Sequence, residues 1–244
     1  MKTKFAILFC PLVKLSFIKK IFFSKPEVPP NKIKHVRGNY QKLRIGTYGG
    51  WSYETAKVSS SVPTVFQQYV KDLKSGYHFG ADFTYFISEN VGFGMKYSMF
   101  KTKNQLDNIY IIDTITGQRR TGKLKDDITI QFFAPTFNTR ISSANKKTNF
   151  LSAVSIGYLA YKNKATVVDD FTLTGSTVGM LFDFGVDFSI AKDFSVGFCF
   201  SYLIGSLSQY NYDDGKQIKT IKFDEGNFEG LSRMDLSVGL RWNR

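Results

Sequence analysis

The chain has 244 residues, and barrels or sandwiches of this length are commonly single domains. It contains 24 Phe, 13 Tyr and 20 Gly but only 6 Pro, a composition that favours β-strands because aromatic side chains suit a pleated surface. The net charge of +13 would suggest a nucleic-acid partner, but residues 1–42 hold ten Lys or Arg and one acid, which leaves about +4 for the rest. We therefore expect no nucleic-acid partner.

The N-terminal segment resembles a secretory signal peptide, because a basic start precedes the apolar run Phe5–Val13. Further lysines interrupt the chain after this run, and no small-x-small cleavage site precedes the basic stretch 25–34. We therefore interpret residues 1–41 as an atypical signal or leader segment and residues 42–244 as one domain. No other stretch reaches the roughly 18 to 20 apolar residues of a membrane-spanning helix, so a place in a membrane would require a barrel.

From residue 42 onward, apolar and polar residues alternate with a period of two, which is typical of β-strands. The clearest segment is 178–190, where apolar side chains at even positions alternate with Gly, Asp and Ser at most odd positions. The strand at 127–140 is predicted from Ile128, Ile130 and Phe132. In all, the pattern predicts eight strands, at about 42–53, 76–85, 91–99, 127–140, 149–162, 178–190, 196–204 and 234–242.

The connections between these strands fall into two classes that alternate along the chain. The short ones are at 87–90, 141–148 and 191–193. The long, polar ones are at 54–74, 102–126, 163–175 and 206–230. This alternation favours an up-and-down barrel with tight periplasmic turns and four larger external loops.

The face opposite the apolar one indicates which way the strands point. It is rich in glycine, whereas a face exposed to water should be rich in Lys, Glu, Thr and Gln; the glycines are Gly76, Gly80, Gly92, Gly94, Gly179, Gly185, Gly197 and Gly239. Glycine weakens a strand, so its repetition indicates the crowded interior of a narrow barrel, and the apolar face should meet lipid. Charged residues in that interior must pair, because an unpaired buried charge is costly. We expect a structural network of Asp82, Lys96, Asp183, Asp187, Arg233, Asp235 and Arg241.

The C-terminal segment Ser237–Arg244 resembles the terminal-strand signal that the outer-membrane assembly machinery reads. Ser237, Gly239 and Trp242 fit its spacing of a polar residue, a glycine and an aromatic residue, while Arg244 stands where a final aromatic residue is usual. Residues 42–244 thus resemble the small outer-membrane β-barrel domain family, which includes OmpA-like and OmpX-like barrels. The resemblance implies an all-β, antiparallel up-and-down transmembrane β-barrel of about eight strands in the cell outer membrane, with outer-membrane lipid and the assembly machinery as partners.

Candidate chemical groups in the sequence have simpler structural interpretations. His78 is the single histidine of the alternating region, and no acidic partner or nucleophile can be assigned to it. Arg119-Arg120 is interpreted as a solvated pair of loop charges, although contact with anionic lipopolysaccharide is an alternative. Asp169-Asp170 and Asp213-Asp214-Gly215 are interpreted as turns, because no full set of oxygen ligands accompanies them. We expect no catalytic, cofactor or metal site.

The expected function is that of an outer-membrane barrel with a side-chain-filled interior, which interacts through its external loops and is not an enzyme. Two alternatives belong to other classes. One is an outer-membrane enzyme that modifies lipid. The other is a soluble, lipocalin-like ligand-binding barrel, which would need an apolar interior.

Overall fold

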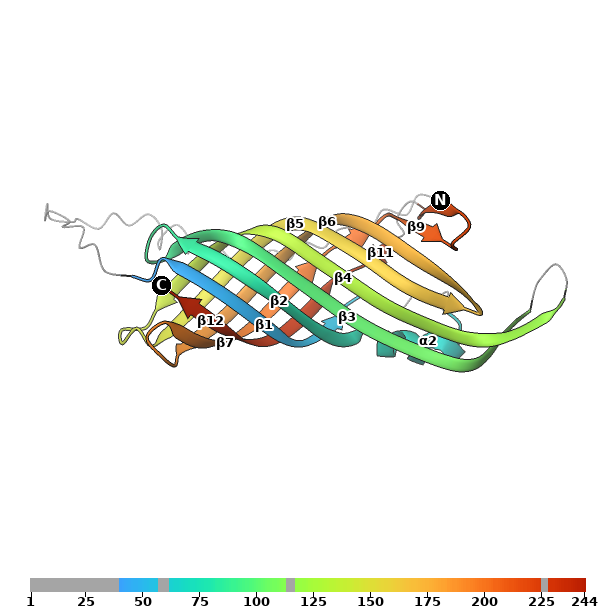
Figure 1. The fold of residues 1–244 in the computed structure, drawn as a ribbon, viewed down its shortest axis with the longest axis horizontal. Coiled ribbons are helices and arrows are strands. Elements are labelled where there is room, and N and C mark those ends of the chain that lie inside the picture. The colour runs from blue at the N-terminus through green and yellow to red at the C-terminus, as the bar shows by residue number, and fades with distance from the viewer. Residues whose placement is uncertain (1–39, 57–61, 113–116, 225–227) are drawn as a thin grey trace, which may run out of the picture. The chain divides into compact units, whose positions relative to one another are not determined.

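The computed structural model describes residues 40–56, 62–112, 117–224 and 228–244, which include helix α2 (Thr64–Leu73) and twelve strands (Figure 1). The long strands are β1 (Leu43–Glu54), β2 (Ser75–Phe86), β3 (Val91–Ile112), β4 (Arg119–Ser142), β5 (Thr148–Val167), β6 (Asp169–Ser189), β7 (Phe194–Ile204) and β12 (Arg233–Asn243). The short ones are β8 (Ser206–Leu207), β9 (Gln209–Asp213), β10 (Ile218–Lys222) and β11 (Glu229–Gly230).

The eight long strands close into a ring in the order β1, β2, β3, β4, β5, β6, β7, β12 and back to β1, and every neighbouring pair is antiparallel. The closing pair, β1 with β12, runs from Arg44↔Asn243 to Glu54↔Arg233. Backbone hydrogen bonds between Leu43 and Arg244, of 2.7 and 2.8 Å, extend it by one step. The prediction of an eight-stranded up-and-down barrel is confirmed, and the ring leaves its central part without a free strand edge.

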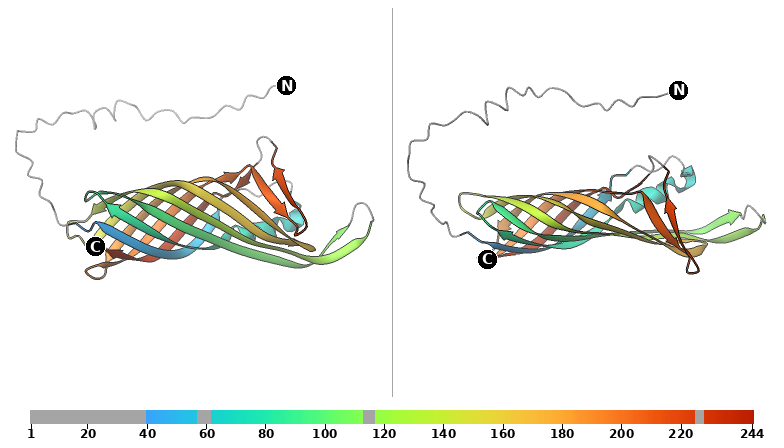
Figure 2. Two further views of the ribbon diagram at one scale, coloured as in Figure 1. Left: turned by 45° about the horizontal axis from the view of Figure 1, so that its top comes forward. Right: turned by 90° about the horizontal axis from the view of Figure 1, so that it is seen from above.

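The two ends of the barrel differ, as Figures 1 and 2 show. At one end lie the C-terminus and the three short connections that the sequence predicts, between β2 and β3, β4 and β5, and β6 and β7. At the other end, β3 and β4 run on well past β1 and β12, and they pair as far as Ile112↔Arg119. We call the paired segments 102–112 and 119–128 the β3–β4 arm.

The structure of two of the expected external loops differs from the prediction. Residues 102–126 and 163–175 were expected to be long loops, but most of them belong to β3, β4, β5 and β6, and β5 pairs with β6 as far as Val167↔Asp169. In these segments polar and charged residues occur on both faces of the strands, so the alternation of apolar and polar residues that reveals a strand is lost.

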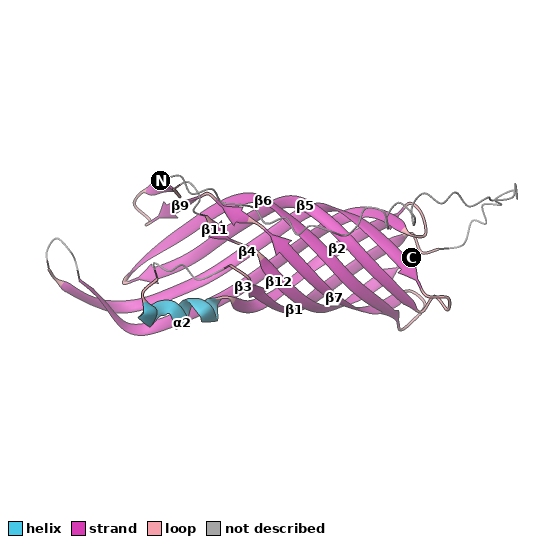
Figure 3. Cartoon of the chain, turned by 180° about the vertical axis from the view of Figure 1, so that it is seen from behind, coloured by secondary structure: helices cyan, strands magenta, loops and turns pink. Residues whose placement is uncertain are grey.

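The remaining two external connections are long, as predicted, but they contain structure of their own. The first holds α2, which lies at the same end of the barrel as the arm (Figure 3). The second holds the hairpin β9–β10, whose first strand pairs with β6 at Thr172↔Asp213. In the described part of the chain, no helix is both long and apolar enough to cross a membrane.

The outer face of the barrel wall is apolar and aromatic. Phe184 is 58% exposed, Phe198 53% and Leu240 57%, in agreement with the predicted outward face of these strands. The expected face of β4 is wrong, however, because Ile130 and Phe132 are fully buried inside the barrel while Phe133 points outward. Both faces of β4 are apolar at this height, so hydrophobicity alone cannot tell inside from outside.

Candidate functional site

The half of the interior nearer the short turns holds a network of ion pairs. The guanidinium group of Arg44 on β1 contacts the carboxylates of Asp82 on β2 and Asp187 on β6, with 2.9 Å between Nε and the Asp187 oxygen. Arg241 on β12 lies 3.9 Å from Asp187. Side chains alternate across a strand, so these four inward positions converge although they are far apart in the sequence.

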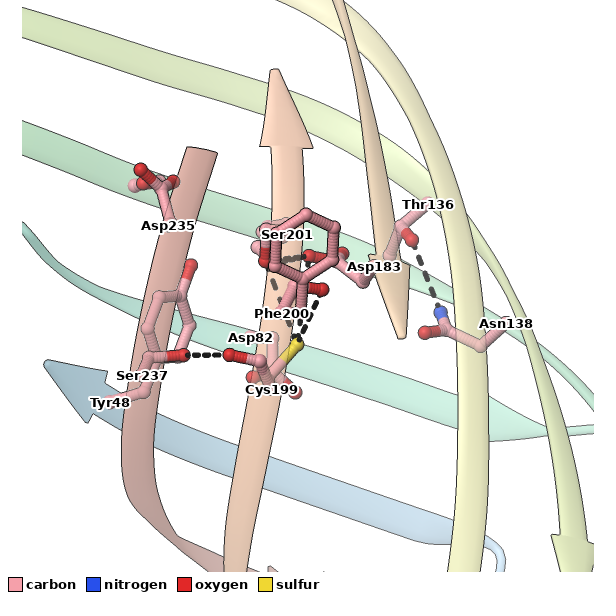
Figure 4. A network of polar contacts seen from close by, with 12 residues as sticks. Tyr48, Asp82, Thr136, Asn138, Asp183, Cys199, Phe200, Ser201, Asp235 and Ser237 are labelled. Carbon is pink, nitrogen blue, oxygen red and sulfur yellow. Dashed lines mark hydrogen bonds and ion pairs between the residues drawn. The ribbon is translucent and has the colours of Figure 1, made fainter. Parts of the chain in front are cut away.

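A second ion pair joins Lys96 on β3 to Asp183 on β6 across the barrel, with 2.6 Å between Nζ and Oδ1. The same carboxylate oxygen accepts a hydrogen bond from Ser201, and Cys199 lies beside it (Figure 4). Lys96 also lies 5.0 Å from the centre of the Tyr48 ring. The Tyr48 ring has room because Gly80 faces it, and a Cβ at that glycine would collide with the ring.

A third group contains His78. Arg233, fully buried, donates from Nε to Asp235 over 3.1 Å and from Nη2 to Ser98 over 3.0 Å. Ser52 donates to Asp235 and lies 2.8 Å from Nδ1 of His78. The acid therefore contacts the serine and not the histidine, whereas a catalytic triad needs the acid to orient the histidine. Ser52 and His78 are also closed off from substrate, with 0% and 2% exposure.

The structure places all seven charged residues expected inside the barrel in its interior, and each is buried or nearly so; they are Asp82, Lys96, Asp183, Asp187, Arg233, Asp235 and Arg241. Arg44 joins two of their carboxylates, although it is not among the interior residues predicted from the sequence. The sequence pattern does contain the information needed to place Arg44. It lies an odd number of residues from the outward-facing Trp51 in the same strand, so its side chain points to the opposite face, which is the interior.

Next to the His78 group, with the guanidinium of Arg233 5.5 Å from the centre of the Phe100 ring, the interior holds a buried apolar cluster, which corrects the expectation of glycine and charge throughout. Its buried side chains are Phe100, Ile130, Phe132, Leu159, Leu181 and Leu203, together with Leu207 and Leu231. The last two belong to the connection 205–232, so this external segment folds into the barrel mouth.

An apolar interior is the feature that a lipocalin-like barrel would need, but here side chains fill it. Phe100, Ile130, Phe132 and Leu159 have no exposed surface. A cavity in the charged half, beside Arg44, Tyr48 and Lys96, measures about 40 Å³. Ligand pockets are typically about 300–1,000 Å³.

Helix α2 covers the inward face of the arm through a buried tyrosine. The Tyr69 hydroxyl donates to the Asp126 carboxylate over 2.8 Å and lies 3.1 Å from the carbonyl oxygen of Asn104. Asn104 donates back to the Tyr69 carbonyl over 3.0 Å, and Asn163 donates to the other Asp126 oxygen. Burial, reinforced by the hydrogen bond to Asp126, raises the pKa of Tyr69, so its hydroxyl stays protonated.

The exposed charges at the external end form one turn and one ion pair, and two expectations are corrected: Arg119 and Arg120 begin β4 instead of lying in a loop, and Asp169 and Asp170 begin β6 instead of forming a turn. Arg120 contacts both carboxylate oxygens of Asp169 at 2.7 Å, with both side chains largely exposed. Asp214 accepts from the backbone N–H groups of Lys216 and Gln217, and Gly215 has a φ of +79°, as expected for a turn. Within the described ranges, no group of three or more His, Cys, Asp or Glu could hold a metal ion.

No protein-family model matches the chain, and no curated protein matches it. Among solved structures, a major outer membrane protein from Thermus thermophilus has a TM-score of 0.54 at 8% identity, covering 83% of this chain and 98% of that one. Neisserial surface protein A (NspA) has a TM-score of 0.47 at 11% identity, covering 83% and 97%. The outer membrane protease OmpT from Escherichia coli has a TM-score of 0.45 at 8% identity, covering 84% and 94%. With its closed ring, partly charged interior and apolar outer wall, the chain has the fold of the small outer-membrane β-barrels.

Proposed function

We propose that this protein is a non-catalytic, non-conducting membrane anchor that presents the β3–β4 arm and the β9–β10 hairpin to partners outside the cell. The observation that carries the proposal is the filling of the interior along its length. Ion-paired side chains occupy the part nearer the short turns, and the apolar cluster, with the inserted residues Leu207 and Leu231 and the adjoining Arg233–Asp235 pair, occupies the rest.

The filled interior argues against a pore. An eight-stranded barrel is just wide enough for its own side chains. In this barrel the long side chains of Arg233, Phe100 and Phe132 are completely buried. An ion would have to displace a buried ion pair and then cross the apolar cluster, and both steps are unfavourable.

The external end has the features of an interaction surface. The pairing of β2 with β3 stops at Tyr77↔Lys101, so the arm beyond this point has no β2 partner along one side of β3. A free strand edge is a template for pairing with another chain. Exposed apolar side chains accompany it, with Tyr110 on the arm 54% exposed and Ile218 on β10 71% exposed.

Planar-bilayer recording tests the first part of the proposal. The purified, folded barrel should give no stable single-channel current, and a variant that combines Phe132→Ala with Leu159→Ala should leak more, because it removes two side chains that close the apolar half. A stable current through the unaltered protein would contradict the proposal.

Photo-crosslinking on living cells tests the second part. A photo-reactive amino acid at Tyr110 or Ile218 should give discrete adducts, whereas the same residue at Ser143, in a short turn at the other end, should not give these adducts. Absence of adducts at both external positions would contradict a role in interaction.

A further inference from the structure

Four lysines form a compact group on the outer wall of the barrel. Lys101 and Lys103 belong to β3, and Lys162 and Lys164 belong to β5, with β4 between them. The register places Lys101 and Lys162 on either side of Thr129, and Lys103 and Lys164 on either side of Asp127. Strand geometry puts the Cα atoms of the four about 10 Å apart across the strands and about 7 Å apart along them. We call these four residues the lysine patch.

The charge of the lysine patch is only partly neutralised by the protein. Lys103, Lys162 and Lys164 are exposed and Lys101 is half-buried, and none of the four forms an ion pair in the described part of the chain. Asp127 is the single carboxylate in the two rows of the register. Lys164 lines a hollow beside the patch that is also lined by Asp170, Asp213 and Asp214. The positive charges of Lys101 and Lys162, in the other row, are therefore the least neutralised by nearby carboxylates.

The lysine patch lies directly next to the apolar wall. On the side of the patch toward the short turns, the next outward-facing row of the register consists of Met99, Gln131 and Ala160. The row after it consists of Tyr97, Phe133 and Tyr158. Phe133 is 53% exposed and Tyr158 is 58% exposed. Aromatic residues of this kind form a girdle at the membrane–water interface, so the lysines, whose nearer row lies two rows farther from the short turns, stand at the level of the lipid headgroups.

We propose that the lysine patch binds the phosphate groups of an anionic lipid in the outer leaflet, while the acyl chains of that lipid lie against Phe133 and Tyr158. Ammonium groups bind phosphate oxygens through charge-assisted hydrogen bonds. A lipid is favoured over a soluble polyanion because it uses both surfaces at once, the lysines and the adjoining aromatic wall. The inference goes beyond the proposed function, since it concerns the barrel wall and not the arm tip or the interior.

The test compares two variants with the same change of charge. Lys101→Gln/Lys162→Gln alters the row nearest the membrane, and Lys219→Gln/Lys222→Gln alters two exposed lysines on β10, away from the patch. Each folded, detergent-solubilised protein is titrated with lipid A carrying its phosphates and with dephosphorylated lipid A, and the bound fraction is measured by native mass spectrometry. Folding of both variants is checked by heat-dependent migration in gel electrophoresis.

The patch variant should bind phosphorylated lipid A about tenfold more weakly than the unaltered protein, and the β10 variant should bind it as the unaltered protein does. Dephosphorylated lipid A should bind weakly to all three. Equal losses in the two variants, or equal binding of the two lipids, would overturn the proposal. Heparin, a soluble polyanion, is titrated in the same way. If the patch variant loses heparin binding while its binding of phosphorylated lipid A is unchanged, the proposal is overturned and the patch is assigned to a soluble ligand.

Discussion

The ion pair between Lys96 and Asp183 offers a quantitative test of the interior. Asp183→Asn removes one charge and keeps the size of the side chain. Lys96 would then remain in the barrel without its partner, although the pair is 2.6 Å apart with only 8% and 10% of the two side chains exposed. Breaking a buried pair in this way typically costs about 3–5 kcal/mol, and we expect a loss of this size in the free energy of unfolding.

Replacing both partners should be much milder. In Lys96→Met/Asp183→Leu no charge is left unpaired, and such exchanges are often neutral or stabilising. The exposed pair of Arg120 and Asp169 supplies the control, since Arg120→Gln should have an effect that is barely measurable.

The assay is urea unfolding of the barrel in lipid vesicles, followed by the fluorescence of the two tryptophans, Trp51 and Trp242. A loss below about 1 kcal/mol for Asp183→Asn, the range of surface pairs, would refute the assignment of this pair to a poorly hydrated interior. So would a double variant that is less stable than the single one.

Three further predictions concern the outer wall of the barrel, the packing of its interior and helix α2. Phe184→Arg places a charge on the lipid face and should destabilise the barrel by about 2–4 kcal/mol in the same unfolding assay, an effect that a soluble barrel would lack. Gly80→Ala should reduce the yield of folded, heat-modifiable protein, because the added Cβ meets the Tyr48 ring; a normal yield would show that the interior has spare room. Since the pKa of Tyr69 is raised, its contribution should be complete below about pH 10 and decline as the pH rises above it, so α2 should become more sensitive to protease there. Tyr69→Phe should lose this pH dependence, and equal sensitivity of the unaltered protein on both sides of about pH 10 would contradict the interpretation.

The sequence predicts the barrel well where each strand separates lipid from a polar interior. There the period of two is strong, as in residues 178–190, and it gives both the strand and its outward face. It fails where the contrast between the two faces disappears. Phe132 and Phe133 are adjacent and both apolar, yet one lies inside and the other outside. In the arm polar residues occur on both faces, and the sequence pattern therefore predicts a loop where the structure has strands.

The candidate site is predictable in part for the same reason. The alternation of side chains between the two faces of each strand is enough to predict that charged residues such as Asp82, Lys96 and Asp187 lie in the interior. This alternation does not predict which charged residues pair with each other. Arg44 and Asp187, for example, are 143 positions apart in the sequence and come into contact because the barrel closes. The lysine patch likewise depends on the register between β3, β4 and β5, which a single sequence does not give.

The most direct test of the account is a cysteine scan along β6, because this strand should alternate between lipid and a filled interior. Single cysteines are introduced at positions 182 to 187 in a variant without Cys10 and Cys199, and each folded protein in vesicles is exposed to a lipid-soluble, thiol-reactive probe. Even positions, which include Phe182 and Phe184, should react, and odd positions, which include Asp183 and Asp187, should not. Reaction at the odd positions and protection of the even ones would show that the apolar face is the core, and would contradict a barrel embedded in the outer membrane.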